Sequence, residues 1–312
     1  MSAAAAIEVV AGVLSDGAGR VLLAQRMPPR DWGGRWEFPG GKREPGEAAA
    51  VALARELREE LGVTVLESAP LIRVPWNGAP RPIVLDAHTV THWQGLPVAR
   101  EGQALRWQPP QALVRAEMPP ADWPVALALR LPPLLRITPP SFDHAQRPRL
   151  LAALQAGDAL LRLRLDDPMR ARELAEALAA EAAAMSRQRL LLDGTRIDLA
   201  RALGCGVHLQ AAQLRTLRAR PVPASQWCGA SCRAAADLAL AQALDCDFAV
   251  LGPVRPTPTH PAAAALGWTR FAALCARTAL PVYALGGLTP ADLPAARAAG
   301  AQGVAGIRAF WR

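Results

Sequence analysis

The sequence predicts an α/β protein of two domains, the second of which is a parallel (β/α)8 barrel. Three observations carry this prediction. The chain has 312 residues, which is long for one domain. Its first third holds a Gly- and Pro-rich segment followed by a strongly periodic helical stretch. Beyond Leu134, short apolar runs alternate with alanine-rich stretches, which is typical of parallel βα units.

The first domain is expected over residues 1–131. Apolar runs at Ile7–Val13 and Arg20–Gln25 surround a turn at Asp16 and Gly17, which predicts a hairpin. After the loop GGRWEFPGGKREPG, a helix is expected over Glu47–Leu61, ended by Gly62. Further strands are predicted near Leu71–Val74 and Ile83–Val90, and a helical segment over Pro110–Leu131.

The second domain is expected over residues 132–312, after a linker at Pro132 and Pro133. Eight apolar runs are candidate strands: LLRIT, ALLRLRL, RLLLD, GVHL, QWCGAS, FAVLGP, VYALGG and GVAGI. Eight such units favour a compact barrel, shorter than the usual ~250 residues.

Composition and charge favour a cytoplasmic protein that acts on small molecules. The net charge is +8, but Lys42 is the only lysine and the arginines are spread along the chain. No basic block with interleaved aromatic residues occurs, so direct nucleic-acid binding is not expected, whereas attraction of phosphorylated metabolites is. The apolar start contains Glu8 and predicts a strand, and no apolar run approaches the ~20 residues that span a bilayer. The five cysteines are expected to be reduced and mostly buried.

The predicted helix over Glu47–Leu61 has two distinct faces. On a helical wheel, Glu56, Glu59 and Glu60 gather on one side. These like charges repel one another, so the face is either solvated or it binds a divalent cation, which prefers oxygen ligands. The glycine loop directly upstream favours the cation. The opposite, apolar stripe consists of Ala50, Leu53, Ala54, Leu57 and Leu61.

The spacing of these residues resembles the Nudix box. Gly41, Glu47, the run Arg55-Glu56-Leu57, the pair Glu59-Glu60 and the end Gly62-Val63 satisfy every position of that motif. The resemblance covers about residues 5–130 and implies an α/β/α sandwich with a mixed sheet. It is closest to the MutT branch, which hydrolyses oxidised guanine nucleoside triphosphates. The segments WEFPGGKREPGE, EGQ at Glu101–Gln103 and MPPAD at Met118–Asp122 also match that branch.

The resemblance implies a site for Mg²⁺, with Mn²⁺ as an alternative. The Gly41 carbonyl, Glu56, Glu59 and Glu60 would hold the metal ions. Glu101 would add a ligand or act as general base. Arg55 would orient the carboxylates, and Glu47 would brace the loop. With the cation bound, water would attack a phosphorus of 8-oxo-dGTP and release 8-oxo-dGMP and pyrophosphate, a reaction that removes a mutagenic nucleotide.

By the same resemblance, Arg26 and Lys42 would face the phosphates, and Phe38, Arg81 and Asp122 would line the base pocket. MutT-like proteins often have asparagine where this chain has Asp122. An ionised aspartate only accepts hydrogen bonds. Asp122 would therefore either accept from ring N–H groups or be protonated in a dry pocket. Oxidised dGTP is the first expectation, and a broader purine range is the other.

The second domain resembles thiamine phosphate synthase over residues 134–312, through GVHLQ, LGPVRPTPTHP, YALGG and AGAQGVAGI. Glycines at Gly286, Gly287 and Gly303 would bind a phosphate through the backbone. The family's metal-binding Asn-Asp pair and later aspartate are Gly194, Thr195 and Gln213 here, and two expected lysines are Asp166 and His260. We therefore expect binding of a thiazole or thiamine phosphate without synthase activity.

Two other interpretations of the barrel stay open. Fusion to the first domain suggests a bifunctional thiamine-pathway protein, whose Nudix half would hydrolyse a thiamine-related diphosphate. The barrel alone could instead be a sensor or scaffold that regulates its neighbour. His208, within an apolar strand, is expected to be a core residue, and His260 to contact a ligand without acid or base work.

Overall fold

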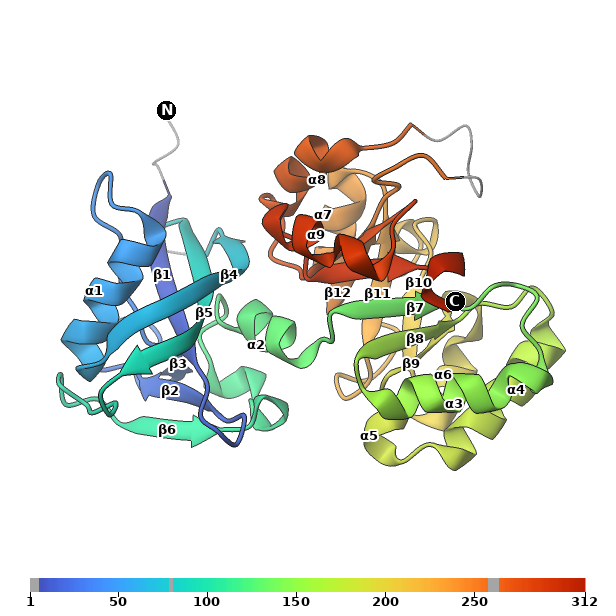
Figure 1. Ribbon diagram of the computed structural model, residues 1–312, viewed down its shortest axis with the longest axis horizontal. Coiled ribbons are helices and arrows are strands. Elements are labelled where there is room, and N and C mark those ends of the chain that lie inside the picture. The colour runs from blue at the N-terminus through green and yellow to red at the C-terminus, as the bar shows by residue number, and fades with distance from the viewer. Residues whose placement is uncertain (1–5, 79–80, 258–263, 312) are drawn as a thin grey trace. The chain divides into compact units, whose positions relative to one another are not determined.

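The computed structural model describes residues 6–78, 81–257 and 264–311. The chain divides into two compact units, Met1–Arg130 and Leu131–Arg312 (Figure 1). His260 lies outside the described residues.

Two small sheets form the first unit. In one sheet, β5 (Ile83–Gln94) is the middle strand, parallel to β1 (Ile7–Leu14) and antiparallel to β4 (Thr64–Trp76). In the other, β2 (Val21–Gln25) is paired antiparallel with both β3 (Trp36–Glu37) and β6 (Leu105–Gln108). The mixed α/β architecture expected from the sequence is confirmed.

Two local predictions for this unit are wrong. The predicted hairpin is absent, because β1 and β2 belong to different sheets and share only the bridge between Ser15 and Val21. The predicted helical segment over Pro110–Leu131 is also interrupted. It consists of short 3-10 turns at Pro110–Ala112 and Arg115–Glu117, followed by α2 (Trp123–Arg130). Prolines at 119 and 120 lack the N–H groups that a continuous helix needs there.

The helix that carries the motif is α1 (Ala49–Leu61). Gly62 ends it with a left-handed φ of 72°, as predicted, and its N–H donates to the Arg58 carbonyl. The buried face consists of Ala52, Leu53, Leu57 and Leu61, which pack with Val10, Leu14 and Leu22. Ala50 is exposed and Ala54 is half-buried, so the buried face is rotated from the predicted stripe toward Ala52.

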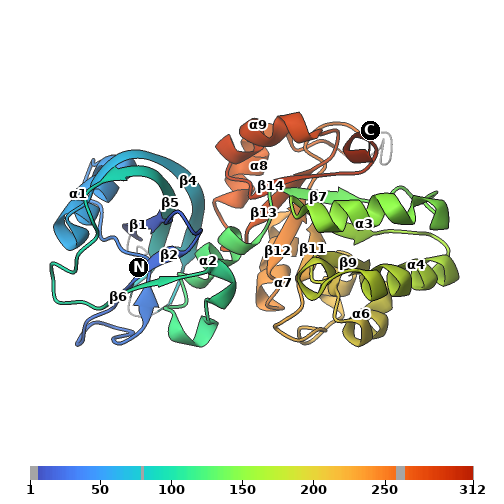
Figure 2. The ribbon, with the colours of Figure 1, turned by 60° about the horizontal axis from the view of Figure 1, so that its bottom comes forward.

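The second unit is a closed eight-stranded parallel barrel, and all eight predicted runs contribute a strand (Figure 2). In closed order the strands are β10, β11, β12, β13, β14, β7, β8 and β9. Their bounds are β7 (Leu134–Ile137), β8 (Ala159–Leu163), β9 (Leu190–Asp193), β10 (Gly206–Leu209), β11 (Cys228–Cys232), β12 (Phe248–Leu251), β13 (Val282–Leu285) and β14 (Gly303–Gly306). The outer helices are α3 (Arg147–Ala156), α4 (Pro168–Glu181), α5 (Ala184–Arg187), α6 (Ile197–Leu203), α7 (Ala235–Ala243), α8 (Gly267–Cys275) and α9 (Leu293–Ala298).

Alternation along the barrel strands divides the side chains into an inner core and an outer core. Inward residues such as Leu135, Leu160, Leu191, Phe248 and Tyr283 fill the barrel. Outward residues pack against the helices. These inward side chains fill the barrel, so it is not an open channel. In barrels of this kind, ligands bind at the carboxyl ends of the strands.

Three predictions about buried groups and membranes are tested by the structure. The five cysteines are buried and unbridged, as expected. His208 is fully buried in β10, also as expected, and burial holds the pKa of its imidazole well below the usual range. Within the described ranges, no helix is both long and apolar enough to cross a membrane.

Candidate active site

The glycine loop after β3 is fastened to the edge of β1. Gly12 donates its N–H to the Pro39 carbonyl, and Val10 donates to the Gly41 carbonyl, both at 2.8 Å. Gly40 has a φ of 151°, and a Cβ there would lie 2.1 Å from the Val10 carbonyl oxygen. Only glycine fits such a close backbone approach.

The same loop lies directly against the carboxylates of α1. The Gly40 N–H donates to Glu60 Oε2 at 3.1 Å. A Cβ on Gly41 would lie 2.2 Å from Glu56 Oε2. The two glycines thus bring backbone and carboxylate groups together at the helix surface, and they do so through contacts that a larger residue would displace.

Arg55 holds part of the carboxylate set in place. Its Nη1 donates to Glu56 Oε1 at 2.9 Å, and its Nε and Nη2 donate to the two Glu47 oxygens at 3.1 and 3.0 Å. These hydrogen bonds, first to Glu47 and then to Glu56, raise the pKa of Arg55, so the guanidinium stays charged. Glu47 also accepts from the Glu44 N–H at 3.0 Å. Arg55 therefore links the loop to the helix.

Glu60 lies among carboxylates and has no cationic partner within the described residues. Its pKa is raised to about 8, chiefly by burial and then by the charges of Glu101, Glu37 and Glu56, against the lowering effect of the Gly40 hydrogen bond. Gln103 positions Glu101 beside it, since its Oε1 accepts from the Glu101 N–H and its Nε2 donates to the Glu60 carbonyl. A divalent cation would relieve this repulsion.

The chemistry of this donor set fits a hard divalent cation, which prefers carboxylate oxygens. In the described part of the chain, no three acidic, histidine or cysteine side chains are already arranged to hold a metal ion. Glu56 and Glu60 lie against the glycine loop, and Glu101 is close enough to Glu60 to raise its pKa. Glu59 is more than half exposed and lies 3.5 Å from Arg55 Nη1. The Gly41 carbonyl is already an acceptor for the Val10 N–H.

A second buried carboxylate lies beside this cluster. Asp122 is 6% exposed, and its Oδ1 accepts from the Phe38 N–H at 2.9 Å. Burial raises its pKa to about 8, and Glu37 adds to the rise. A protonated carboxyl can both donate and accept, as an amide does. The structure therefore favours the protonated alternative for Asp122 near neutral pH.

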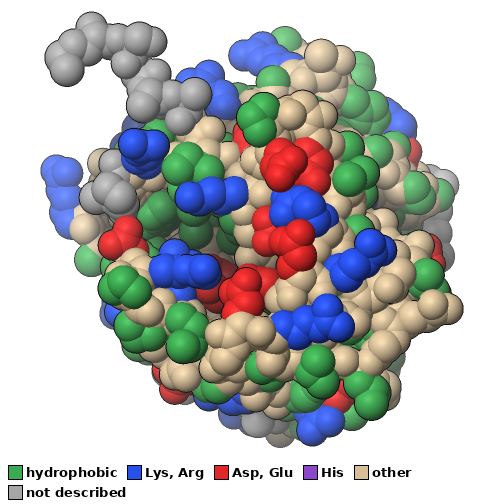
Figure 3. Space-filling model, turned by 90° about the vertical axis from the view of Figure 1, so that its left-hand side faces the viewer, with side chains coloured by type: hydrophobic (Ala, Val, Ile, Leu, Met, Phe, Trp, Pro, Cys, Tyr) green, Lys and Arg blue, Asp and Glu red, His purple; other side chains and the backbone are tan. Residues whose placement is uncertain are grey.

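The other predicted substrate-binding residues are distributed unevenly. Arg26 Nη1 forms an ion pair with Glu37 at 2.7 Å, and Glu37 in turn lies near Glu60 and Asp122. Lys42 is exposed at the loop. Arg81 is exposed before β5, at the end of the sheet where Ile7 bonds to Pro82, and no described contact joins it to Phe38 or Asp122. Figure 3 shows acidic side chains gathered on this side of the molecule, flanked by basic ones and beside a hollow.

Sequence reasoning missed three contributors: Glu37, Gly40 and Gln103. Glu37 raises the pKa of both Glu60 and Asp122, so it lies close to the carboxylate cluster and to Asp122 alike. Its position next to Phe38 in the loop was the available signal, but the box pattern begins only at Gly41.

The carboxyl ends of the barrel strands surround a cavity of about 870 Å³. Gly286 and Gly287, both with positive φ, line it, together with Gly306. Gly303 does not. It lies at the opposite end of β14, where a Cβ would meet the Pro133 carbonyl oxygen at 1.9 Å. The prediction that Gly303 binds phosphate is therefore not supported by its place in the barrel.

The positions where the resemblance expects magnesium ligands are occupied by an internal hydrogen-bond network. Gln213 Nε2 donates to the Gly194 carbonyl at 2.8 Å, and its Oε1 accepts from the Gln210 N–H at 2.9 Å. Asp193, the one carboxylate among the cavity-lining residues, forms a buried ion pair with Arg162 Nη2 at 2.7 Å. These residues do not fit a resident Mg²⁺.

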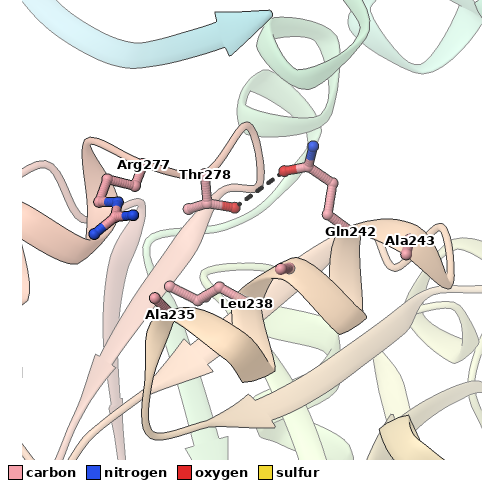
Figure 4. Close-up of a pocket in the computed structure, with 7 residues that line it drawn as sticks. Ala235, Leu238, Gln242, Ala243, Arg277 and Thr278 are labelled. Atoms are coloured by element: carbon pink, nitrogen blue, oxygen red, sulfur yellow. Dashed lines mark hydrogen bonds between the residues drawn. The ribbon is translucent and has the colours of Figure 1, made fainter. Parts of the chain in front are cut away.

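A separate cavity of about 370 Å³ lies on the outer side of the barrel, between α7 and the end of α8 (Figure 4). Gln242 Oε1 accepts there from Thr278 Oγ1 and from the Ala279 N–H. Arg277 is its single ionisable lining residue. This cavity therefore holds no combination of side chains suited to catalysis.

Comparisons with known proteins match both units. The NUDIX domain model matches residues 7–129, and the thiamine monophosphate synthase model matches residues 134–310. CTP pyrophosphohydrolase of Escherichia coli is 41% identical over 38% of this chain and 87% of that protein. 8-oxo-dGTP diphosphatase of Haemophilus influenzae is 36% identical over 37% of this chain and 85% of that protein.

Thiamine-phosphate synthase of Parasynechococcus marenigrum is 35% identical over 57% of this chain and 51% of that protein. This chain thus spans about half the length of that relative. The chain belongs to the Nudix hydrolases over residues 7–129 and to the thiamine monophosphate synthase family over residues 134–310.

Proposed function

We propose that the N-terminal unit hydrolyses oxidised purine nucleoside triphosphates, with 8-oxo-dGTP as the preferred substrate. The observation that carries the proposal is the half-buried Glu60, which lies among Glu37, Glu56 and Glu101 against the glycine loop. Mg²⁺ or Mn²⁺, when bound, would neutralise phosphate oxygens and make water more acidic. The carboxylates of Glu56, Glu60 and Glu101 would hold the cation, with Glu59 at the outer edge.

The chain's own cations would orient the triphosphate. Lys42 is exposed on the loop, where its ammonium group can reach a phosphate. Arg26 is held by Glu37, next to the carboxylate cluster, so a phosphate would compete with Glu37 for its guanidinium. Glu101, placed by Gln103 beside Glu60, is a candidate acceptor for the proton of the attacking water.

Base preference would depend on Asp122. With its pKa raised to about 8, the carboxyl is mostly protonated at neutral pH and can donate to one atom of an oxidised purine edge while accepting from another. The relatives include both a diphosphatase named for 8-oxo-dGTP and a pyrophosphohydrolase named for CTP, so the base must be tested directly.

The test is a substrate panel on the intact protein with Mg²⁺. 8-oxo-dGTP, dGTP, dATP and CTP are compared by kcat/KM, and released pyrophosphate is distinguished from released phosphate. We expect pyrophosphate as the product and 8-oxo-dGTP as the best substrate. Equal rates for 8-oxo-dGTP and dGTP would contradict the preference, and a higher rate for CTP would assign the site to pyrimidines.

For the barrel we propose a binding role for a phosphorylated thiazole- or thiamine-like molecule, without synthesis of thiamine phosphate. The internal bonding of Gln213 and the ion pair of Asp193 support this, because a diphosphate leaving group would have no carboxylate-held metal. Incubation of the intact protein with the two thiamine phosphate precursors and Mg²⁺ tests it. Formation of thiamine phosphate would instead support the bifunctional thiamine-pathway alternative.

A regulatory role for the barrel has a separate test. Thiazole phosphate and thiamine phosphate are titrated calorimetrically, and hydrolysis of 8-oxo-dGTP is measured with each present. Binding with a change of hydrolysis rate would support a sensor. Binding without such a change would limit the barrel to ligand capture.

A further inference from the structure

The cavity at the barrel mouth carries an excess of positive charge. Its lining includes one aspartate, Asp193, and five arginines: Arg162, Arg164, Arg215, Arg233 and Arg308. Two of these arginines have carboxylate partners, Arg162 with Asp193 and Arg215 with Asp237 at 3.0 Å.

The remaining three arginines are uncompensated. Across the described ranges, no carboxylate lies within ion-pair distance of Arg164, Arg233 or Arg308. The sequence of residues 258–263, PTHPAA, contains no acidic residue either. Arg164 also lies close enough to Arg162 to lower its pKa, in addition to the larger effect of burial. Like charges kept together at a cavity indicate an anionic ligand.

A cation cannot replace these arginines as the partner of that anion. Asp193 Oδ1 accepts from Arg162 Nε at 2.8 Å as well as from Nη2, so the one acidic lining residue is already neutralised. Gln213 is fully occupied by backbone partners. A divalent cation at this mouth would meet guanidinium groups and no free carboxylate, which is unfavourable.

The anion-binding groups lie on two opposite sides of the mouth. In the closed strand order, β13 is opposite β9 and β14 is opposite β10. Gly286 and Gly287 follow β13, and Arg308 follows β14. Arg164 follows β8 and Arg215 follows β10, on the other side.

Apolar side chains also line the cavity. Ile137, Val250 and Leu285 are inward residues of the upper barrel and also line the cavity. A volume of about 870 Å³ fits a small organic molecule. A molecule with a phosphoryl group at each end could contact the groups that follow β13 and β14 and, across the mouth, those that follow β8 and β10.

We propose that the barrel mouth is a metal-independent binding site for a small molecule with two phosphoryl groups, held by Arg164, Arg215, Arg233 and Arg308 together with the glycine backbone. The arginines take the place that a carboxylate-bound cation would otherwise have. Guanidinium groups bind phosphate oxygens in a bidentate manner and need no metal to do so. This proposal is independent of nucleotide hydrolysis by the N-terminal unit.

The test is calorimetry on the full-length protein with 1,5-pentanediol bisphosphate as the probe and inorganic phosphate as the single-phosphoryl comparison. Titrations are run in EDTA and repeated with Mg²⁺. We expect one bisphosphate per chain in EDTA, bound at least ~10-fold more tightly than inorganic phosphate, and no gain in affinity from Mg²⁺. A requirement for Mg²⁺, or the absence of bisphosphate binding, would overturn the proposal.

Variants locate the site. Arg233 follows β11 and Arg308 follows β14, three strands apart in the closed order. Arg233→Gln and Arg308→Gln should each weaken bisphosphate binding by roughly 10-fold. Arg297→Gln is the matched control, because Arg297 is exposed on α9 and does not line the cavity. Lys42→Gln should also leave this affinity unchanged. An equal loss in either control, or no loss in the two mouth variants, would place the binding elsewhere.

Discussion

The two units address phosphate chemistry with opposite charges. Carboxylates cluster around the N-terminal glycine loop, and burial together with the neighbouring charges raises the pKa of Glu60 to about 8. At the barrel mouth, arginines gather and the one aspartate is held in an ion pair. The first arrangement needs a cation before an anion can bind. The second attracts an anion directly.

This difference indicates different tasks. A cation held by carboxylates can neutralise developing charge and activate water, which suits hydrolysis. Guanidinium groups bind phosphate without generating a nucleophile, which suits capture of a ligand. On the proposals made above, the N-terminal unit performs the chemistry and the barrel performs recognition, and single charge changes in each unit test this division.

The largest expected effect is the loss of hydrolysis in Glu60→Gln. Glutamine can still accept the Gly40 hydrogen bond, but it cannot ionise to hold a cation as a carboxylate would. We expect kcat/KM for 8-oxo-dGTP to fall about 1,000-fold, with stability unchanged or increased because a half-buried carboxyl among like charges is replaced by a neutral amide. Glu67→Gln is the control, since Glu67 is exposed and pairs with His92. Full activity of Glu60→Gln would contradict the proposal that Glu60 holds the catalytic cation.

The next largest effect concerns Asp193 in the barrel. Asp193→Asn would leave the buried guanidinium of Arg162 without its counter-charge, which costs about 3 kcal/mol of unfolding free energy. Chemical denaturation of the full-length protein measures it. Asp158→Asn breaks an exposed pair with Arg136 and should cost less than about 1 kcal/mol. If both variants behave alike, Asp193 is not needed to neutralise Arg162 and would be free to bind a metal.

A smaller effect is expected from Gly41→Ala. The new Cβ would meet the Glu56 carboxylate at 2.2 Å, and this flexible group can move away, so folding should be preserved. Glu56 would then leave its place beside the loop, and we expect kcat/KM to fall about 30-fold. Gly17→Ala is the control, because a Cβ there meets no atom within 4 Å. Unchanged kinetics would show that the position of Glu56 is unimportant.

The extent to which the sequence predicts each region follows from how local its determinants are. The cluster on α1 is encoded by spacing within one helix and its preceding loop, so Glu56, Glu60 and Gly41 could be located in advance. The barrel strands could be located too, because each is a short apolar run. The arginine-lined mouth could not, because Arg164, Arg233 and Arg308 are far apart in sequence and meet only when the barrel closes.

Non-local determinants also account for the features that the sequence did not predict correctly. Whether two successive strands pair depends on the sheet each one joins, which Ser15 and Val21 do not encode. Gly303 is expected from the sequence at the end of a late barrel strand, but it is the first residue of β14, and the end at which a residue lies depends on where the strand begins. The role of Glu37 appears only when folding brings β3 close to both Glu60 and Asp122.

The smallest expected effect on hydrolysis belongs to Asp122→Asn, whose stability should nevertheless depend on pH, and this variant separates the proposed base pocket from the proposed cation site. The pKa of Asp122 is raised to about 8 in the folded protein, so as pH rises above about 4 only the unfolded chain loses this proton and wild-type stability falls. Asparagine keeps the acceptor for the Phe38 N–H and does not titrate. The variant should therefore gain stability over the wild type progressively as the pH rises from 4 to 8, with almost no difference at pH 4, measured by denaturation. Because a protonated carboxyl and an amide offer the same donor and acceptor, 8-oxo-dGTP hydrolysis at pH 7 should be nearly equal in the two proteins. A stability difference that does not grow with pH would mean that Asp122 is ionised throughout, and it would then belong with the carboxylates that need a cation.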